Sequence, residues 1–110
     1  MPKFISFFSY TGEAAKAMIE RPSDRSAAAK ALTESLGGTM EAFYWMHGDH
    51  DGFLITELPD GVSVAALAAA VGATGAVGNL ETHQIFDRDE QAAIVKAAAT
   101  ARAAYKPPTA

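Results

Sequence analysis

Four segments of this chain alternate apolar and polar residues in the manner of strands, and they are rich in aromatic and β-branched side chains. We expect strands over residues 3–10, 40–47, 52–58 and 77–86. In the first of them Phe4, Ser6, Phe8 and Tyr10 share one face, and Ile5, Phe7 and Ser9 share the other. Both faces are therefore largely apolar.

Helix start and stop signals separate these strands. Thr11 is placed to cap a helix over residues 12–20, Pro22 ends it, and Ser23 or Asp24 starts a second helix that runs to about Leu36. We expect these two pieces to form one kinked crossover. A third, alanine-rich helix is predicted from the helical spacing of Val64, Leu67, Ala68 and Val71. A capping box at residues 87–90 predicts a last helix through about Tyr105.

The resulting order, βαββαβ followed by a helix, is the split-βαβ pattern of a ferredoxin-like α+β domain with a four-stranded antiparallel sheet. A length of 110 residues fits one domain, which we expect to span residues 1–105 with a flexible tail at 106–110.

Two crossover helices can cover only one face of such a sheet, which leaves a second apolar face to explain. An aromatic patch of that size is uncommon on monomers. We therefore expect two subunits to associate sheet to sheet, as a homodimer or higher oligomer. The alternative is that the last helix folds back over this face.

Composition narrows the classes of partner. The formal net charge is −4 and no cluster of lysine or arginine is present, so we expect neither nucleic acid nor a membrane surface as a partner. The chain has no cysteine, which excludes disulfides and thiolate chemistry. The apolar N-terminal stretch is too short for a signal peptide, so a cytoplasmic location is the expectation.

The densest group of chemically capable residues lies at a predicted hairpin over residues 43–60, where a polar turn separates an aromatic strand from an apolar one. This hairpin resembles the signature of the GYD-domain family, small bacterial proteins of ferredoxin-like type, with His50 standing where that family usually has a tyrosine. The resemblance extends over residues 3–97. It implies the fold and an association of the dimeric α+β barrel type, but it supplies no agreed catalytic residues.

His50 is the leading candidate for acid–base chemistry, because a carboxylate from Asp49 or Asp51 would hold its second nitrogen. Arg25 or Tyr10 would then polarise a substrate oxygen, as in a small cofactor-free isomerase or monooxygenase-like enzyme. A second hypothesis is a metal site formed by His47, His50 and His83. The structural alternative is that Asp49 and Asp51 fix the turn while His50 is solvated.

Aromatic residues offer a third kind of site. Tyr44 and Trp45 should face opposite sides of their strand, and with Phe8 they are candidates to line a pocket for a small apolar or aromatic ligand. The alternative is that these rings form the subunit interface. The sequence leaves the cofactor unknown. The interpretation favoured by the whole pattern is a homo-oligomeric binding or scaffolding module, with the question of enzymatic activity left open.

Overall fold

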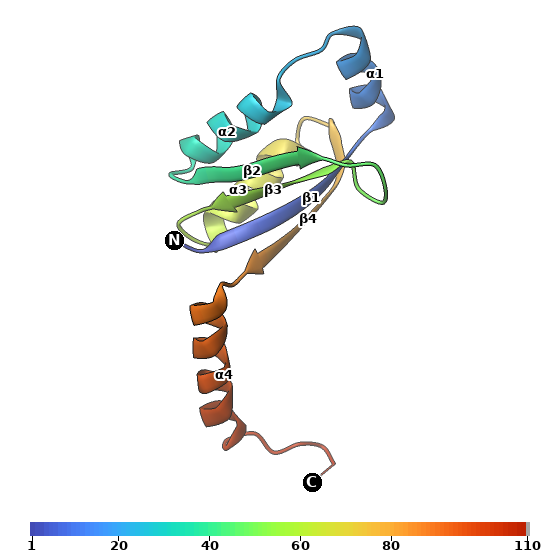
Figure 1. The fold of residues 1–110 in the computed structure, drawn as a ribbon. Coiled ribbons are helices and arrows are strands. Elements are labelled where there is room, and N and C mark those ends of the chain that lie inside the picture. Colours follow the sequence, from blue (N-terminus) through green and yellow to red (C-terminus); the bar gives the residue numbers. More distant parts are fainter. Residues whose placement is uncertain (110) are drawn as a thin grey trace.

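A computed structural model describes residues 1–109 as a four-stranded antiparallel sheet with helices, in the strand order β2-β3-β1-β4 (Figure 1). The elements are β1 (Lys3–Tyr10), α1 (Gly12–Glu20), α2 (Arg25–Ser35), β2 (Thr39–Trp45), β3 (Gly52–Glu57), α3 (Gly61–Gly72), β4 (Val77–Ile85) and α4 (Arg88–Arg102). The predicted ferredoxin-like α+β fold is confirmed. The last residue of the expected tail, 110, lies outside the described residues. Among residues 1–109, no helix is both long enough and apolar enough to cross a membrane.

The crossover after β1 consists of two helices, α1 and α2, as the predicted stop and restart of the helix indicated. Pro22 lies in the break, and Asp24 makes a new helix start there: its Oδ1 accepts the backbone N–H groups of Ser26 at 3.0 Å and Ala27 at 3.2 Å. At the other end of α2, Gly37 adopts a φ of 82°, the left-handed conformation that commonly follows the end of a helix.

The helix-covered face of the sheet holds a small core at one end. Phe4, Leu58 and Leu67 are buried there, with Leu32 and Val64 packed against them. These residues join α2 and α3 to the sheet. At the other end of the same face, towards Phe8 and Tyr10, the layers do not close.

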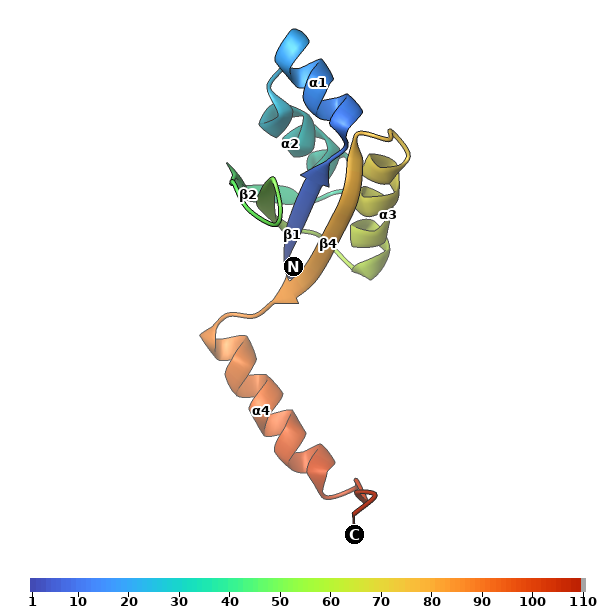
Figure 2. The same cartoon turned by 90° about the vertical axis from the view of Figure 1, so that its right-hand side faces the viewer.

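The opposite face of the sheet is covered by no element of the described chain (Figure 2). Antiparallel pairing aligns Tyr44 with Phe53 and Phe53 with Phe7, which places three rings in one row across β2, β3 and β1. The ring centroids are 5.6 Å apart for Tyr44 and Phe53, and 6.1 Å apart for Phe53 and Phe7. We call this row, with its neighbours Ile5 and Ile55, the open-face patch.

The last helix does not fold back over this patch, and that alternative is wrong. Figures 1 and 2 show α4 extending away from the sheet, and none of its residues is buried. Its start is well formed, because Asp87 and Glu90 make the predicted capping box. The radius of gyration is 17.6 Å, whereas a compact chain of this length has one of about 13 Å. Within the described residues, the helix is thus an arm that buries none of its side chains on the sheet domain.

Candidate functional site

The polar hairpin loop between β2 and β3 covers residues 46–51 and is tied to β1. The Met46 N–H donates to the Asp51 carbonyl at 2.9 Å, and the Asp51 N–H donates to the Phe8 carbonyl at 2.8 Å. The Asp51 carboxylate accepts the backbone N–H of Tyr10 at 2.7 Å. Asp51 is therefore engaged in holding the hairpin, which agrees with the structural alternative for this residue.

His50 points to the open face of the sheet, and its partner there is Glu81. The distance from Nε2 to Glu81 Oε2 is 3.4 Å, and the distance from Nδ1 to Ser9 Oγ is also 3.4 Å. The imidazole lies against Phe7, with the ring centroids 5.4 Å apart, and its side chain is 22% exposed. The Asp51 carboxylate does not hold His50, because it faces the β1 backbone; the carboxylate beside His50 is that of Glu81.

Glu81 also approaches a second histidine. His83 Nε2 lies 3.6 Å from Glu81 Oε1, so one carboxylate on β4 stands between two imidazoles. His47, the third residue of the metal hypothesis, is exposed in the hairpin loop. Within residues 1–109, no three His, Cys, Asp or Glu side chains are grouped so as to hold a metal ion. The metal assignment of His47, His50 and His83 stays a prediction.

The sheet separates the proposed acid–base residues. Arg25 and Tyr10 lie on the helix-covered side, where both line a cavity, whereas His50 lies on the open face. The four candidates His50, Asp51, Arg25 and Tyr10 therefore do not meet in one site. The polar side chains beside the His50 imidazole are those of Glu81 and Ser9.

The proposed ligand-binding aromatics are likewise divided between the two faces. Trp45 Nε1 donates to the Tyr10 hydroxyl at 3.3 Å, and the Trp45 ring packs on Phe43 with 4.8 Å between centroids. Tyr44 stacks on Phe53 on the other side. The opposite orientation of these two neighbours is confirmed. Phe8 and Trp45 share the helix side, and Tyr44 belongs to the open-face patch.

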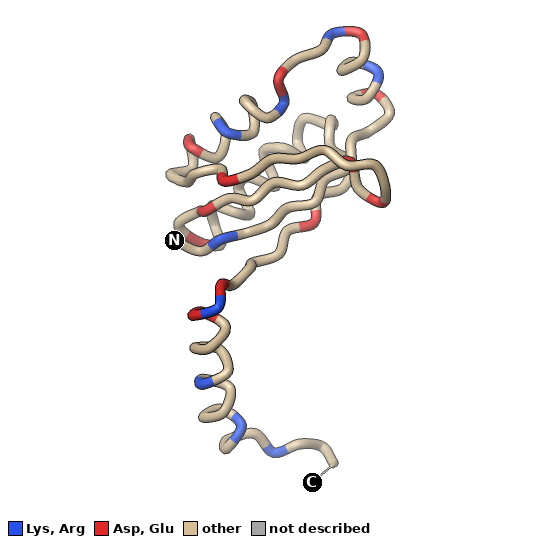
Figure 3. Tube along the Cα trace, viewed as in Figure 1, with Lys and Arg blue, Asp and Glu red and all other residues tan. Residues whose placement is uncertain are grey.

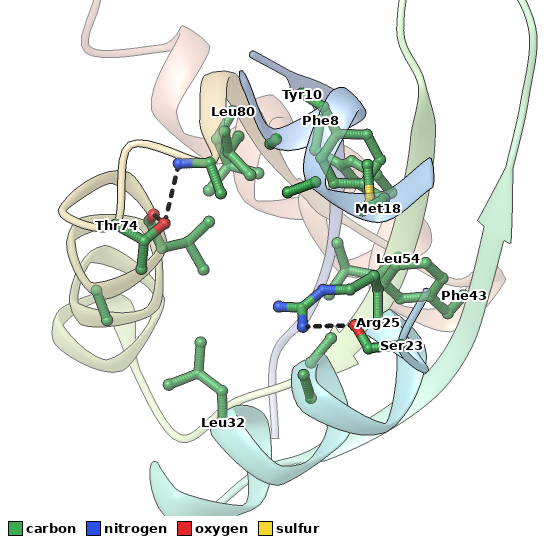
Figure 4. A pocket seen from close by; sticks show the side chains of 18 of the residues that line it. Phe8, Tyr10, Met18, Ser23, Arg25, Leu32, Phe43, Leu54, Thr74 and Leu80 are labelled. Carbon is green, nitrogen blue, oxygen red and sulfur yellow. Dashed lines mark hydrogen bonds between the residues drawn. The ribbon is translucent and has the colours of Figure 1, made fainter. Parts of the chain in front are cut away.

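A cavity of about 550 Å³ lies between the sheet and the helices α1, α2 and α3 (Figure 4). Phe8, Phe43, Leu54 and Leu80 form its floor, and the helices contribute mainly alanines. The sequence interpretation missed this cavity. The signal was present in the alanines that face the sheet, which are too small to fill the space above it.

Charged residues are distributed unevenly along the strands of the sheet. In β1, β2 and β3 the charged residues stand together at one end of the sheet (Figure 3). Lys3 Nζ lies 2.7 Å from Glu41 Oε2 there, and this hydrogen bond raises the pKa of Lys3 above its ordinary value. The middle of these three strands carries no charge in the part of the chain that the structure describes.

The fold and the hairpin together define an α+β protein of the GYD type. Residues 4–95 match the model of the GYD domain, and the chain belongs to that family. No curated protein matches it.

Two solved structures match much of this chain, and the first is similar in fold. TTHA0845 from Thermus thermophilus has 16% sequence identity and a TM-score of 0.52, with 79% of this chain and 95% of that chain covered. PA3566 from Pseudomonas aeruginosa has 14% identity and a TM-score of 0.45, with 78% and 93% covered. At 16% identity, the similarity to TTHA0845 concerns the fold alone.

Proposed function

We propose that this protein is a homo-oligomeric binding module whose copies associate through the open faces of their sheets. The observation that carries the proposal is the uncovered row of Tyr44, Phe53 and Phe7. Tyr44 is 61% exposed, although its ring stacks on an apolar neighbour. Burying such a row against a second copy removes apolar surface from water, which is the main driving force of association.

The surroundings of the open-face patch support this proposal. Ile5 and Ile55 extend it along the strands, while Lys3 and Glu41 mark one end. Glu81 and its two histidines lie along the β4 edge. An apolar centre with a polar rim is the usual anatomy of a protein interface.

The detached helix α4 supports association in a second way. Ile94, Val95 and Tyr105 are large apolar side chains that remain exposed on this arm. Ile94, Ala98 and Ala101 follow one another at helical spacing, which forms a stripe along one side of α4. A helix of this kind gains most of its stability from packing its apolar side on a partner. A second copy of the chain provides such a partner.

The experiment that tests this function is a measurement of subunit number on the untagged protein, with Tyr44→Asp as the disrupting variant. A charged side chain in the centre of a dry interface is unfavourable, so this variant should be monomeric. A wild-type monomer at all concentrations would contradict the proposal.

A second candidate function is cofactor-free acid–base catalysis at His50, and one observation favours it. The imidazole stands between a hydroxyl from Ser9 and the carboxylate of Glu81, an arrangement suited to a general base. The test is exchange of the α-protons of enolisable keto acids in D₂O, followed by NMR. Exchange that is lost in His50→Gln and kept in Arg25→Met would support the site; no exchange above buffer would rule it out.

A further inference from the structure

The cavity on the helix-covered side is large for a domain of this size, and its walls explain why. Protein interiors normally contain few voids larger than a water molecule. Here Ala14 and Ala17 from α1, Ala28 and Ala29 from α2, and Ala70 from α3 face the space. Methyl side chains at these positions leave it open. A volume of about 550 Å³ lies within the usual range for small-molecule sites.

Two arginines give this apolar space a polar end of one sign. Arg21 and Arg25 both line the cavity, and none of its lining residues is an aspartate or glutamate. Figure 4 shows the Arg25 guanidinium extending over the space. Its hydrogen bond is a long one, 3.4 Å from Nη1 to Ser23 Oγ, and no ion pair within residues 1–109 includes Arg25. Arg21 is paired with Glu20 at 3.8 Å, so Arg25 is the arginine at this end without an ion-pair partner among the described residues.

We propose that the cavity binds an amphipathic monocarboxylate, with its apolar chain or ring over Phe8 and Leu54 and its carboxylate at Arg25. The planar guanidinium has donors that match the two oxygens of a carboxylate, and such bidentate pairs are among the stronger hydrogen bonds in proteins. The hydroxyl of Ser23 lies beside it as a further donor. The apolar floor then accounts for the body of the ligand, and the guanidinium accounts for its charge.

This site is separate from the sheet-to-sheet association. The cavity lies under the helices, whereas the open-face patch lies on the other side of the sheet. Pairing of two sheets leaves the helix layer of each copy facing outward. The two proposals can therefore be tested independently. Association of subunits is tested by the native mass, and ligand binding in the cavity is tested by a binding curve.

The protein contains its own reporter for this cavity. Trp45 is the single tryptophan, and it packs on Phe43, one of the residues of the cavity floor. Titration of the full chain with dodecanoate, below the concentration at which that ligand forms micelles, should change the fluorescence of Trp45 and saturate. Dodecanol, which has the same chain and no charge, serves as the neutral probe.

Two variants and one control separate the parts of the site. Arg25→Met removes the charge and should weaken dodecanoate binding about tenfold or more, while dodecanol binding stays the same. Ala29→Leu narrows the cavity and should weaken binding of both probes. Lys30→Met removes an equal charge from the exposed side of the same helix, and it should change neither.

The proposal is overturned by either of two results. One is a wild-type protein that binds neither probe. The other is dodecanoate binding that is the same in Arg25→Met and in Ala29→Leu as in wild type, which would place the ligand elsewhere. Circular dichroism of each variant confirms that the helices are intact.

Discussion

The carboxylate of Asp51 accepts the backbone N–H of Tyr10 at 2.7 Å and thereby fastens the hairpin loop to the end of β1. Pairing of β1 with β3 ends at Phe8 and Gly52, so the Tyr10 N–H needs a partner beyond the regular strand register. Asp51 supplies it from the first residue outside β3. Asp51 at the hairpin therefore has a structural role.

Replacement of Asp51 by alanine should destabilise the protein by about 1–3 kcal/mol, because the half-buried N–H of Tyr10 loses its acceptor. The free energy of unfolding in urea measures this. Asp49→Ala in the exposed part of the same loop is the matched control and should stay within about 0.5 kcal/mol of wild type. Equal effects of the two variants would contradict the assignment.

Gly52 should not tolerate any larger side chain. A Cβ atom at this buried position would clash with the Phe8 ring and with the Tyr44 carbonyl. We expect Gly52→Ala to cost about 1–3 kcal/mol of stability, the usual range for overpacking. Gly48→Ala is the comparison, because a methyl there meets no atom within 4 Å in the described chain. Thermal and urea unfolding of the two variants should differ clearly.

Because aspartates cap two of the helices, the stability of the folded protein should depend on pH in the acidic range. The Ser26 hydroxyl lowers the pKa of Asp24 by hydrogen bonding, and the Ser63 N–H does the same for the pKa of Asp60. A lowered pKa in the folded state stabilises the fold above the ordinary value of about 3.9, and this contribution is lost as the pH falls through the lowered pKa. Both groups are exposed, so the effect is modest.

The measurement is the urea midpoint of wild type and of Asp24→Ala/Asp60→Ala as a function of pH. The gap between them should be largest near neutral pH and should close below pH about 4. A gap that is constant over this range would show that the two carboxylates do not act through their charge.

The α4 arm should matter for assembly and not for the stability of the single chain. Ile94→Asp places a charge on its apolar stripe, where the side chain is exposed in the protomer. The free energy of unfolding of the monomer should therefore change by less than about 0.5 kcal/mol. The protein concentration at which the chains associate should rise. Thr100→Asp, on another side of the same helix, is the control. Sedimentation velocity at several protein concentrations should show weaker association for Ile94→Asp than for Thr100→Asp.

Local sequence signals were sufficient for the elements of this fold. The strand of residues 3–10 and the helix of residues 12–20 have the predicted bounds, because the alternation of Phe4 to Tyr10 and the cap at Thr11 act over a few residues. The capping box at Asp87 and Glu90 is equally local, and it is found as expected. Sequence alone did not show that α4 leaves the body, because helix periodicity does not tell which surface a helix packs on.

The candidate site depended on long-range geometry that local patterns do not contain. His50 meets Glu81 only because β4 pairs with β1 in the register that sets Phe7 opposite Glu81. Nearby Asp49 and Asp51 were the natural candidates in sequence, but Asp51 was already needed by the backbone. Tyr10 fell on the helix side because successive residues of a strand point to opposite faces. Arg25 lies on that side because it begins α2.

The most direct test of the account is the native mass of the untagged protein, compared with that of Tyr44→Asp and Ile19→Asp. Ile19 is an apolar residue of α1 that is 81% exposed and lies outside the open-face patch, so it controls for the same chemical change elsewhere. We expect wild type and Ile19→Asp to be dimers or larger assemblies and Tyr44→Asp to be a folded monomer. A wild-type monomer, or a Tyr44→Asp variant with unchanged subunit number, would contradict sheet-to-sheet association.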